Sequence, residues 1–204
     1  MTEGERALVR ISAAMATRRK DDLQDAFDRA HSVAPDEAIE EVILQGYLFL
    51  GFPVALNAMS MWRRISGRAS PNPSEIDCAG WEARGKVVCA EVYAGQYQRL
   101  REHVRALHPD LESWMVIEGY GKVLGRPGLD LPVRELCVAS LLAVLGTPKQ
   151  LFSHLRGAIN VGATPGQVEL ALEVARPYMD EASKALAWRT WERVVASQAP
   201  RAEG

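Results

Sequence analysis

Apolar residues recur at every third or fourth position along most of this chain, a spacing that is typical of amphipathic helices. No stretch alternates apolar and polar residues over the length of a β-strand. In the first third of the chain, the spacing predicts helices over about 5–16, 21–31, 35–50 and 53–66. Asp21 can cap the second helix, and Pro53 suits the first turn of the fourth. We therefore predict an all-α protein.

A segment rich in glycine, proline and serine follows these helices. Residues 66–74 contain few apolar side chains, so we expect a linker over 67–76 between an N-terminal half, 1–66, and a C-terminal half, 77–204. Thr147-Pro148-Lys149-Gln150 and Thr164-Pro165-Gly166-Gln167 each read as a helix start with a capping box. These signals and the apolar spacing predict helices over about 75–83, 86–107, 110–123, 131–145, 147–162, 165–178 and 181–197.

The two ends of the chain show the same order of predicted helices. Residues 5–65 and 134–194 align at an offset of 129 positions, which places Trp62 over Trp191, Glu40 over Glu169 and Ala34 over Ala163. Identities at this offset are sparse, so the match depends on the shared apolar register and the placement of turns. It predicts an internal duplication, with two duplicated helical halves.

The composition restricts the class of protein. With 204 residues, 48% of them hydrophobic, the chain can bury the core of one domain or of two fused halves. A net charge of −2 gives no reason to expect nucleic acid as a partner. The only basic triplet, Arg18-Arg19-Lys20, is followed by two aspartates, so we interpret it as a solvated helix end.

The sequence also gives an expectation about location. The N-terminus lacks a basic and then apolar signal pattern, and the most apolar stretch, Leu136–Leu145, is too short to span a bilayer. We expect a cytoplasmic protein without membrane contact. Cys78, Cys89 and Cys137 form no Cys-x-x-Cys, which fits reduced, buried thiols in a reducing compartment. The four histidines are too dispersed to predict a metal site.

Two ionisable residues lie on apolar helix faces. Glu135 shares a stripe with Leu131, Val138 and Leu142, and His154 lies on the apolar side of the next predicted helix. Burial favours the neutral forms of both groups, whereas direct pairing favours the charged forms. The pair could therefore exchange a proton near neutral pH, as a general acid or base requires. The alternative is a buried structural hydrogen bond or ion pair.

The sequence around these two residues resembles a known motif. Arg134-Glu135-Leu136, followed by Gln150-Leu151-Phe152-Ser153-His154-Leu155-Arg156-Gly157-Ala158-Ile159-Asn160-Val161-Gly162-Ala163-Thr164, is similar to the core motif of the carboxymuconolactone decarboxylase and AhpD-like family. The similarity covers most of residues 35–65 and 108–180. It implies an AhpD-like helical bundle.

The resemblance favours one branch of the family. The AhpD-like branch carries a Cys-x-x-Cys just before the histidine, but this chain has Thr147 and Gln150 there, and neither side chain gives a thiolate. The decarboxylase branch works without cysteines. The resemblance thus implies a cofactor-free lyase for a small carboxylated or carbonyl-bearing metabolite, with His154 as general acid/base and Glu135 as its proton-sharing partner.

Loss of carbon dioxide leaves an electron pair that must move into a neighbouring carbonyl, so such a site needs hydrogen-bond donors toward the enolate. The candidate substrate-binding residues are Tyr120, Arg134, Thr147 and Gln150. Each has an alternative structural role. Gln150 and Thr147 can form the capping box, Tyr120 can lie at the edge of the core, and Arg134 can be a surface charge.

At the same offset of 129, the first half places Arg6 at the Glu135 position and Asp25 at the His154 position. No second proton relay is expected there, so the first half is interpreted as a degenerate structural copy. Its aromatic residues Tyr47, Phe49 and Phe52 can form apolar walls of the site or pack in the core.

Two other functions remain open. One is a thiol-dependent hydroperoxide reductase that recruits Cys137 or Cys89, which requires a thiol of lowered pKa. The other is a non-catalytic helical protein that binds a ligand or supports an assembly. The family resemblance also implies a homo-oligomer, a trimer or an assembly of trimers, in which Met59, Met61 and Trp188 would be exposed apolar contact residues.

Overall fold

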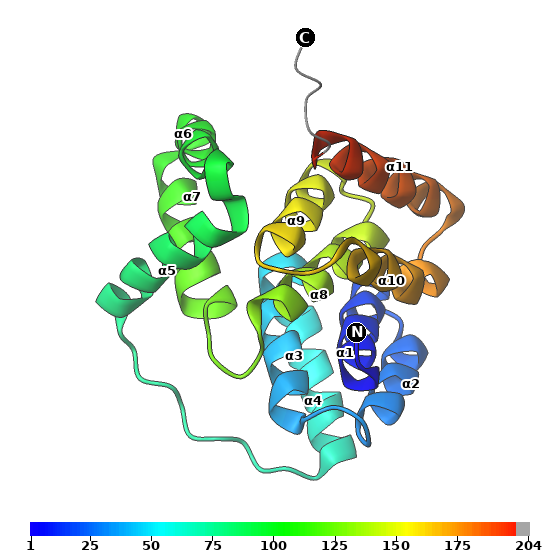
Figure 1. Ribbon diagram of the computed structural model, residues 1–204. Helices are drawn as coiled ribbons and strands as arrows, with labels where there is room; N and C mark the ends of the chain where they lie inside the picture. The colour runs from blue at the N-terminus through cyan, green and yellow to red at the C-terminus, as the bar shows by residue number, and fades with distance from the viewer. Residues whose placement is uncertain (199–204) are drawn as a thin grey trace.

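The computed structural model describes residues 1–198, and all regular elements in that range are helical (Figure 1). This confirms the predicted all-α class. The α-helices are α1 (Glu3–Thr17), α2 (Lys20–Ala30), α3 (Asp36–Leu50), α4 (Phe52–Ser66), α5 (Cys78–Tyr93), α6 (Tyr97–Leu107), α7 (Pro109–Trp114), α8 (Leu131–Val144), α9 (Pro148–Asn160), α10 (Pro165–Ala175) and α11 (Glu181–Gln198). The remaining helical segments are the 3-10 turns η1 (Ala94–Gln96) and η3 (Arg176–Tyr178) and the π-helix η2 (Met115–Leu124).

Helices α1 and α8 pack against each other at the centre of the molecule. Both helices are buried over most of their length. The Ser12 hydroxyl links them by donating to the Cys137 carbonyl at 2.7 Å. Ser140 Oγ lies 2.8 Å from the Cys137 carbonyl of its own helix and 3.2 Å from the Val9 carbonyl of α1. Both hydroxyls are buried, so these bonds also satisfy groups that would otherwise be costly to remove from water.

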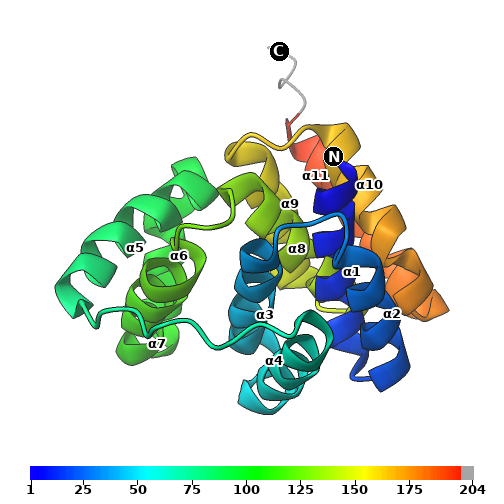
Figure 2. The ribbon, with the colours of Figure 1, turned by 90° about the horizontal axis from the view of Figure 1, so that it is seen from below.

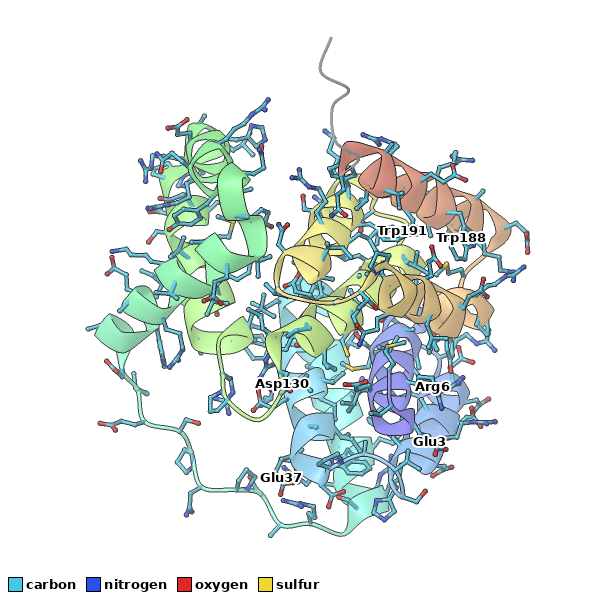
Figure 3. The ribbon with its side chains drawn as sticks, viewed as in Figure 1. Glu3, Arg6, Glu37, Asp130, Trp188 and Trp191 are labelled. Atoms are coloured by element: carbon cyan, nitrogen blue, oxygen red, sulfur yellow. The ribbon has the colours of Figure 1, made fainter. Side chains whose placement is uncertain are left out.

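The helices on either side of this contact follow the same order. Helix α1 packs against α2, α3 and α4, and α8 packs against α9, α10 and α11. Trp62 in α4 and Trp191 in α11 are both buried, but their indole N–H groups differ in whether they form a hydrogen bond. Trp191, labelled in Figure 3, donates to Glu169 Oε1 at 3.1 Å, whereas Trp62 Nε1 has no partner among the described residues. Duplication remains a prediction that this arrangement favours.

Residues 78–124 form a separate helical lobe beside the bundle (Figures 1 and 2). A connection without helix, residues 67–77, leads from α4 into this lobe, where the sequence predicts a linker. Inside the lobe, α5 and η2 approach closely. A Cβ added at Gly85 would lie 2.0 Å from the Val116 carbonyl oxygen, and one at Gly121 would lie 1.9 Å from that of Trp81. The lobe and both halves contribute to one hydrophobic core, so the linker does not separate two independent cores.

Several predicted helix ends were wrong. The expected helix 86–107 is broken at Ala94, whose φ of +46° is outside the helical region, and α5 crosses the expected gap before residue 86. Asp21 does not cap α2, which begins at Lys20. The predicted box at Thr147 is also absent, because that hydroxyl lies against the Leu142 carbonyl at 3.3 Å. The box formed by Thr164 and Gln167 is confirmed.

The exposed apolar surface also differs from the expectation. Met61 is buried, and Met59 and Trp188 are half-buried. The large apolar side chains that do reach solvent are Leu44, Phe52, Leu56, Ile76, Val87, Leu107, Leu111, Trp114 and Val195. Within residues 1–198, no helix combines the length and the apolar character needed to cross a bilayer.

A buried ion-pair network holds the connection between η2 and α8 against α3. The Arg134 side chain is only 1% exposed, which shows that the surface-charge alternative was wrong. Its Nη2 lies 2.7 Å from Glu41 Oε2, and the same guanidinium donates to Gln45 and to the carbonyl of Leu129. Arg126 also binds Glu41, at 3.0 Å. The network therefore holds the first turn of α8 in place at Arg134, the residue that directly precedes Glu135.

We predict that Glu41→Gln lowers the free energy of unfolding by about 3–5 kcal/mol, because it leaves the Arg134 guanidinium buried without its counter-ion. The double variant Glu41→Leu/Arg134→Met should lose less than the sum of its single variants, because no buried charge then remains unpaired. Urea unfolding measures these changes. Glu37→Gln is the control, because the Glu37 side chain is 66% exposed in its pair with Arg68. An effect of Glu41→Gln no larger than this control would contradict the prediction.

Candidate functional site

Glu135 on α8 and His154 on α9 meet inside the bundle. Glu135 Oε2 lies 2.8 Å from His154 Nδ1. The Glu135 side chain is 0% exposed and the His154 side chain 8%, so the imidazole lies at the outer side of the carboxyl group. The structure thus brings together the two residues that the sequence singled out. Their catalytic role remains a prediction.

The contact orients the imidazole. If Nδ1–H donates to the carboxylate, the neutral ring keeps a lone pair on Nε2 and can accept a proton there. The Phe49 ring from α3 lies edge-on to the imidazole, with 5.7 Å between ring centroids, so Phe49 forms one apolar wall of the site. Tyr47 and Phe52 instead stack on each other, and Phe52 is 63% exposed, which excludes core packing for Phe52.

The second carboxylate oxygen, Glu135 Oε1, is buried and has no hydrogen-bond partner among the described residues. Such an atom is rare in a folded protein, and a catalytic role is one of the explanations for it. Tyr93 and Tyr120 belong to the same cluster, with 3.2 Å between their hydroxyl oxygens. Burial, with the negative charge of Glu135 adding to it, raises the pKa of both phenols, which therefore remain protonated donors at neutral pH.

Gly157 allows α9 to lie close to α8 and α5. A Cβ at this position would lie 2.7 Å from Glu135 Oε2 and 2.7 Å from Val92 Cγ1. One turn further along α9, Asn160 Nδ2 donates to the Val92 carbonyl at 2.8 Å and ties α9 to α5. Gly157 and Tyr93 are not among the residues that the sequence singled out. A signal for Gly157 was present, since it lies in the quoted motif three residues after His154.

The predicted substrate-binding residues lie in different surroundings. Tyr120 is in the cluster beside Glu135, but it is almost fully buried. Arg134 lies in the ion-pair network with Glu41, and its guanidinium is occupied there. Gln150 is exposed in the first turn of α9, four residues before His154, and Thr147 lies at the start of that helix. The structure therefore brings only Tyr120 into the cluster around the pair.

A cavity of about 220 Å³ lies beside this cluster, between the lobe and α9. Tyr93 and Ser153 form part of its wall, and Ser153 directly precedes His154. Arg99, His103 and Arg156 line the cavity without an acidic residue. A small anion in this cavity would therefore find the positive charge of Arg99 and Arg156 beside Tyr93, whereas Glu135 and His154 do not line the cavity.

The first half contains no second pair of this kind. Arg6 lies on α1 (Figure 3) and is exposed, and Asp25 on α2 is exposed and pairs with Arg29 at 2.8 Å. In the described part of the chain, no group of three or more His, Cys, Asp or Glu side chains is placed to hold a metal ion.

The two buried cysteines are not activated. Cys78 is exposed, and Cys89 and Cys137 are buried. Burial raises the pKa of Cys89 from its ordinary 9.0 to about 12, and burial raises that of Cys137 as well. A thiol-dependent reductase needs the opposite shift, because the thiolate is the nucleophile.

These features define an all-helical protein with a buried carboxylate and imidazole pair at the junction of two helices. Residues 109–191 match the model of the carboxymuconolactone decarboxylase family, which confirms the resemblance. The match includes Glu135, His154 and Gly157. The chain is also similar to "Peroxisomal protein 2" of Schizosaccharomyces pombe, at 28% identity over 148 residues, which cover 68% of this chain and 68% of that protein.

We predict that Gly157→Ala destabilises the protein by about 1–3 kcal/mol, because the new methyl group must displace Glu135 or the buried Val92. Urea unfolding tests this, and the ring ¹⁵N signals of His154 report whether its bond to Glu135 persists. Gly166→Ala is the matched control, since a Cβ there has open space within α10 and alanine favours helix. Equal stability of the two variants would contradict the close approach that Gly157 permits.

Proposed function

We propose that this protein is a cofactor-free lyase that moves a proton on a small carboxylated or carbonyl-bearing metabolite. His154 acts as the general acid/base, and Glu135 orients it and shares its proton. The observation that carries this proposal is the 2.8 Å contact between a fully buried carboxyl group and a slightly exposed imidazole. The family of residues 109–191 supports the same reaction class.

The order of the groups suits proton transfer. The carboxylate lies behind the imidazole, where it stabilises the imidazolium that forms when His154 takes up a proton. In a decarboxylation, the bond to the carboxylate carbon breaks, carbon dioxide leaves, and the electron pair moves into a neighbouring carbonyl as an enolate. The imidazolium, which carries the proton that His154 took from the carboxylic acid group of the substrate, then gives this proton to the carbon atom that lost carbon dioxide. Each step balances without a redox partner.

Neighbouring side chains are suited to such a substrate. The protonated phenols of Tyr93 and Tyr120 are candidate donors toward an enolate oxygen. Arg99 and Arg156, at the 220 Å³ cavity, are candidate partners of a substrate carboxylate. Gln150 and Thr147 remain candidates from the sequence, whereas Arg134 is no longer proposed, because Glu41 and Gln45 occupy its guanidinium.

The test is proton exchange in D₂O. The protein is incubated with carboxylated lactones and 3-oxo acids, and NMR follows both deuterium uptake beside the carbonyl and loss of the carboxylate. We expect His154→Gln to slow the catalysed reaction at least about 100-fold, the usual contribution of a general acid or base. Glu135→Gln should also slow it and should change its pH profile, because the amide cannot share the proton.

His31→Gln is the control for these variants. It removes a half-exposed imidazole from the other half of the chain and should leave the rate unchanged. An unchanged rate in folded His154→Gln would refute the proposal. Binding of a substrate without exchange or carbon dioxide loss would favour the non-catalytic ligand-binding protein instead.

The raised thiol pKa values argue against the hydroperoxide reductase. We predict that a maleimide near pH 8 modifies only Cys78 in the folded protein and all three cysteines after unfolding in guanidinium chloride. Mass spectrometry of the modified peptides measures this. The pKa of the Cys89 thiol is about 9 in the unfolded chain and about 12 in the folded protein. The folded state therefore binds this proton more tightly, and the stability that the thiol contributes is lost as the pH rises from about 9 to about 12. Rapid modification of Cys89 or Cys137 by peroxide would restore the reductase hypothesis.

We also propose a homo-oligomer, such as a trimer. The exposed Phe52 and Leu56 on α4 and Trp114 on α7 support this, because exposed apolar side chains of this size are common at subunit contacts. We retain the cytoplasmic location that the sequence favoured. The name of the Schizosaccharomyces pombe relative makes a peroxisome the alternative location.

A further inference from the structure

A second cavity, of about 320 Å³, lies in the first half of the chain, where the end of α1 and the start of α2 face α4. Its volume is near the lower end of the range for small-molecule sites, roughly 300–1,000 Å³. We call it the elbow groove. It is lined by Ala14, Met15, Arg18, Arg19, Lys20, Leu23, Val54, Asn57, Ser60, Met61 and Arg64.

The rim of the elbow groove is strongly basic. Arg18, Arg19 and Lys20 lie on one side and Arg64 on the other, and no acidic residue lines the cavity. Of these four cations, only Arg19 forms an ion pair within residues 1–198, with Asp22 at 3.4 Å. The chain as a whole has a net charge of −2, so this local excess of positive charge is unusual for it. The four cations share one ion pair, and they repel each other unless an anion lies between them.

The backbone at the elbow adds to this positive charge. Arg18 ends α1 in the left-handed conformation, with φ of +59°, at a position where glycine is usual. Helix α2 begins two residues later without a side-chain cap, and the two aspartates of its first turn, Asp21 and Asp22, do not line the groove. The two aspartates that follow Arg18-Arg19-Lys20 in the sequence predict a solvated helix end. These basic side chains are exposed as expected, but they also line a cavity.

The floor of the elbow groove is apolar. Met15, Leu23 and Met61 are buried beneath it, and Val54 adds a further branched side chain. An inorganic ion would contact only the rim, whereas a molecule with a short hydrocarbon body could also cover this floor. One arginine guanidinium can donate two parallel hydrogen bonds to two oxygens of a phosphate. This geometry favours a phosphate as the anionic group.

We propose that the elbow groove binds a soluble phosphate monoester with a short apolar body. Arg18, Lys20 and Arg64 contact the phosphate, and the methionine and leucine floor contacts the hydrocarbon. The groove is lined by α1, α2, the turn between them and α4, so this site is separate from the Glu135 and His154 pair.

Calorimetric titration of the full chain with hexyl phosphate and with inorganic phosphate tests the proposal. We expect hexyl phosphate to bind at least about tenfold more tightly, because its chain buries apolar surface. Arg64→Gln should weaken binding of hexyl phosphate by about tenfold. Asn57→Asp should weaken it similarly, because it places a negative charge in the groove at an exposed position that does not affect the core.

Two variants serve as controls. Arg29→Gln removes the same type of charge from α2 outside the groove, and His154→Gln alters only the proposed catalytic pair, so both should bind hexyl phosphate like the wild type. The proposal is overturned if hexyl phosphate binds no better than inorganic phosphate, or if Arg64→Gln and Asn57→Asp bind like Arg29→Gln. It is also overturned if the protein binds vesicles of phosphatidic acid in phosphatidylcholine but not soluble hexyl phosphate.

Discussion

The close packing of α1 against α8 is the contact on which the rest of the structure depends. Each helix is buried on several sides, and the Ser12 hydroxyl donates across the contact to the Cys137 carbonyl. Helix α8 is surrounded by other helices. Successive side chains along it point in directions about 100° apart, so neighbouring residues contact different elements. Arg134 reaches α3 and the connection from η2, and Glu135 reaches α9. A single helix thus anchors the lobe and presents the carboxyl group of the candidate site.

The second partner of the site is placed by a different kind of contact. Helix α9 approaches α8 and α5 closely because Gly157 has no side chain, and Asn160 ties it to the Val92 carbonyl. His154 then lies with one ring nitrogen on Glu135 and its edge on Phe49. The carboxyl group is wholly buried and the imidazole nearly so. Removing two such groups from water costs free energy, and their direct pairing offsets part of that cost.

The two halves share an order of helices but differ in the chemistry that they carry. The second half encloses the carboxyl and imidazole pair, whereas the matching residues of the first half, Arg6 and Asp25, are exposed. The first half instead collects cations around the elbow groove, with Arg64 facing the turn between α1 and α2. If the halves arose by duplication, one copy retained the buried pair, and the other acquired a basic groove on a separate face.

The sequence by itself determined the helical class, the order of the helices and the pair Glu135 and His154, because apolar spacing and a local motif report directly on helix faces. It also placed the capping box at Thr164, which depends on neighbouring residues alone. Only the tertiary structure decided that Arg134 is buried against Glu41, that Tyr93 joins Tyr120, and that Arg18 and Arg64 face one cavity. Each of those contacts joins residues far apart in the chain, and their formation depends on how whole helices pack, which a local pattern does not encode.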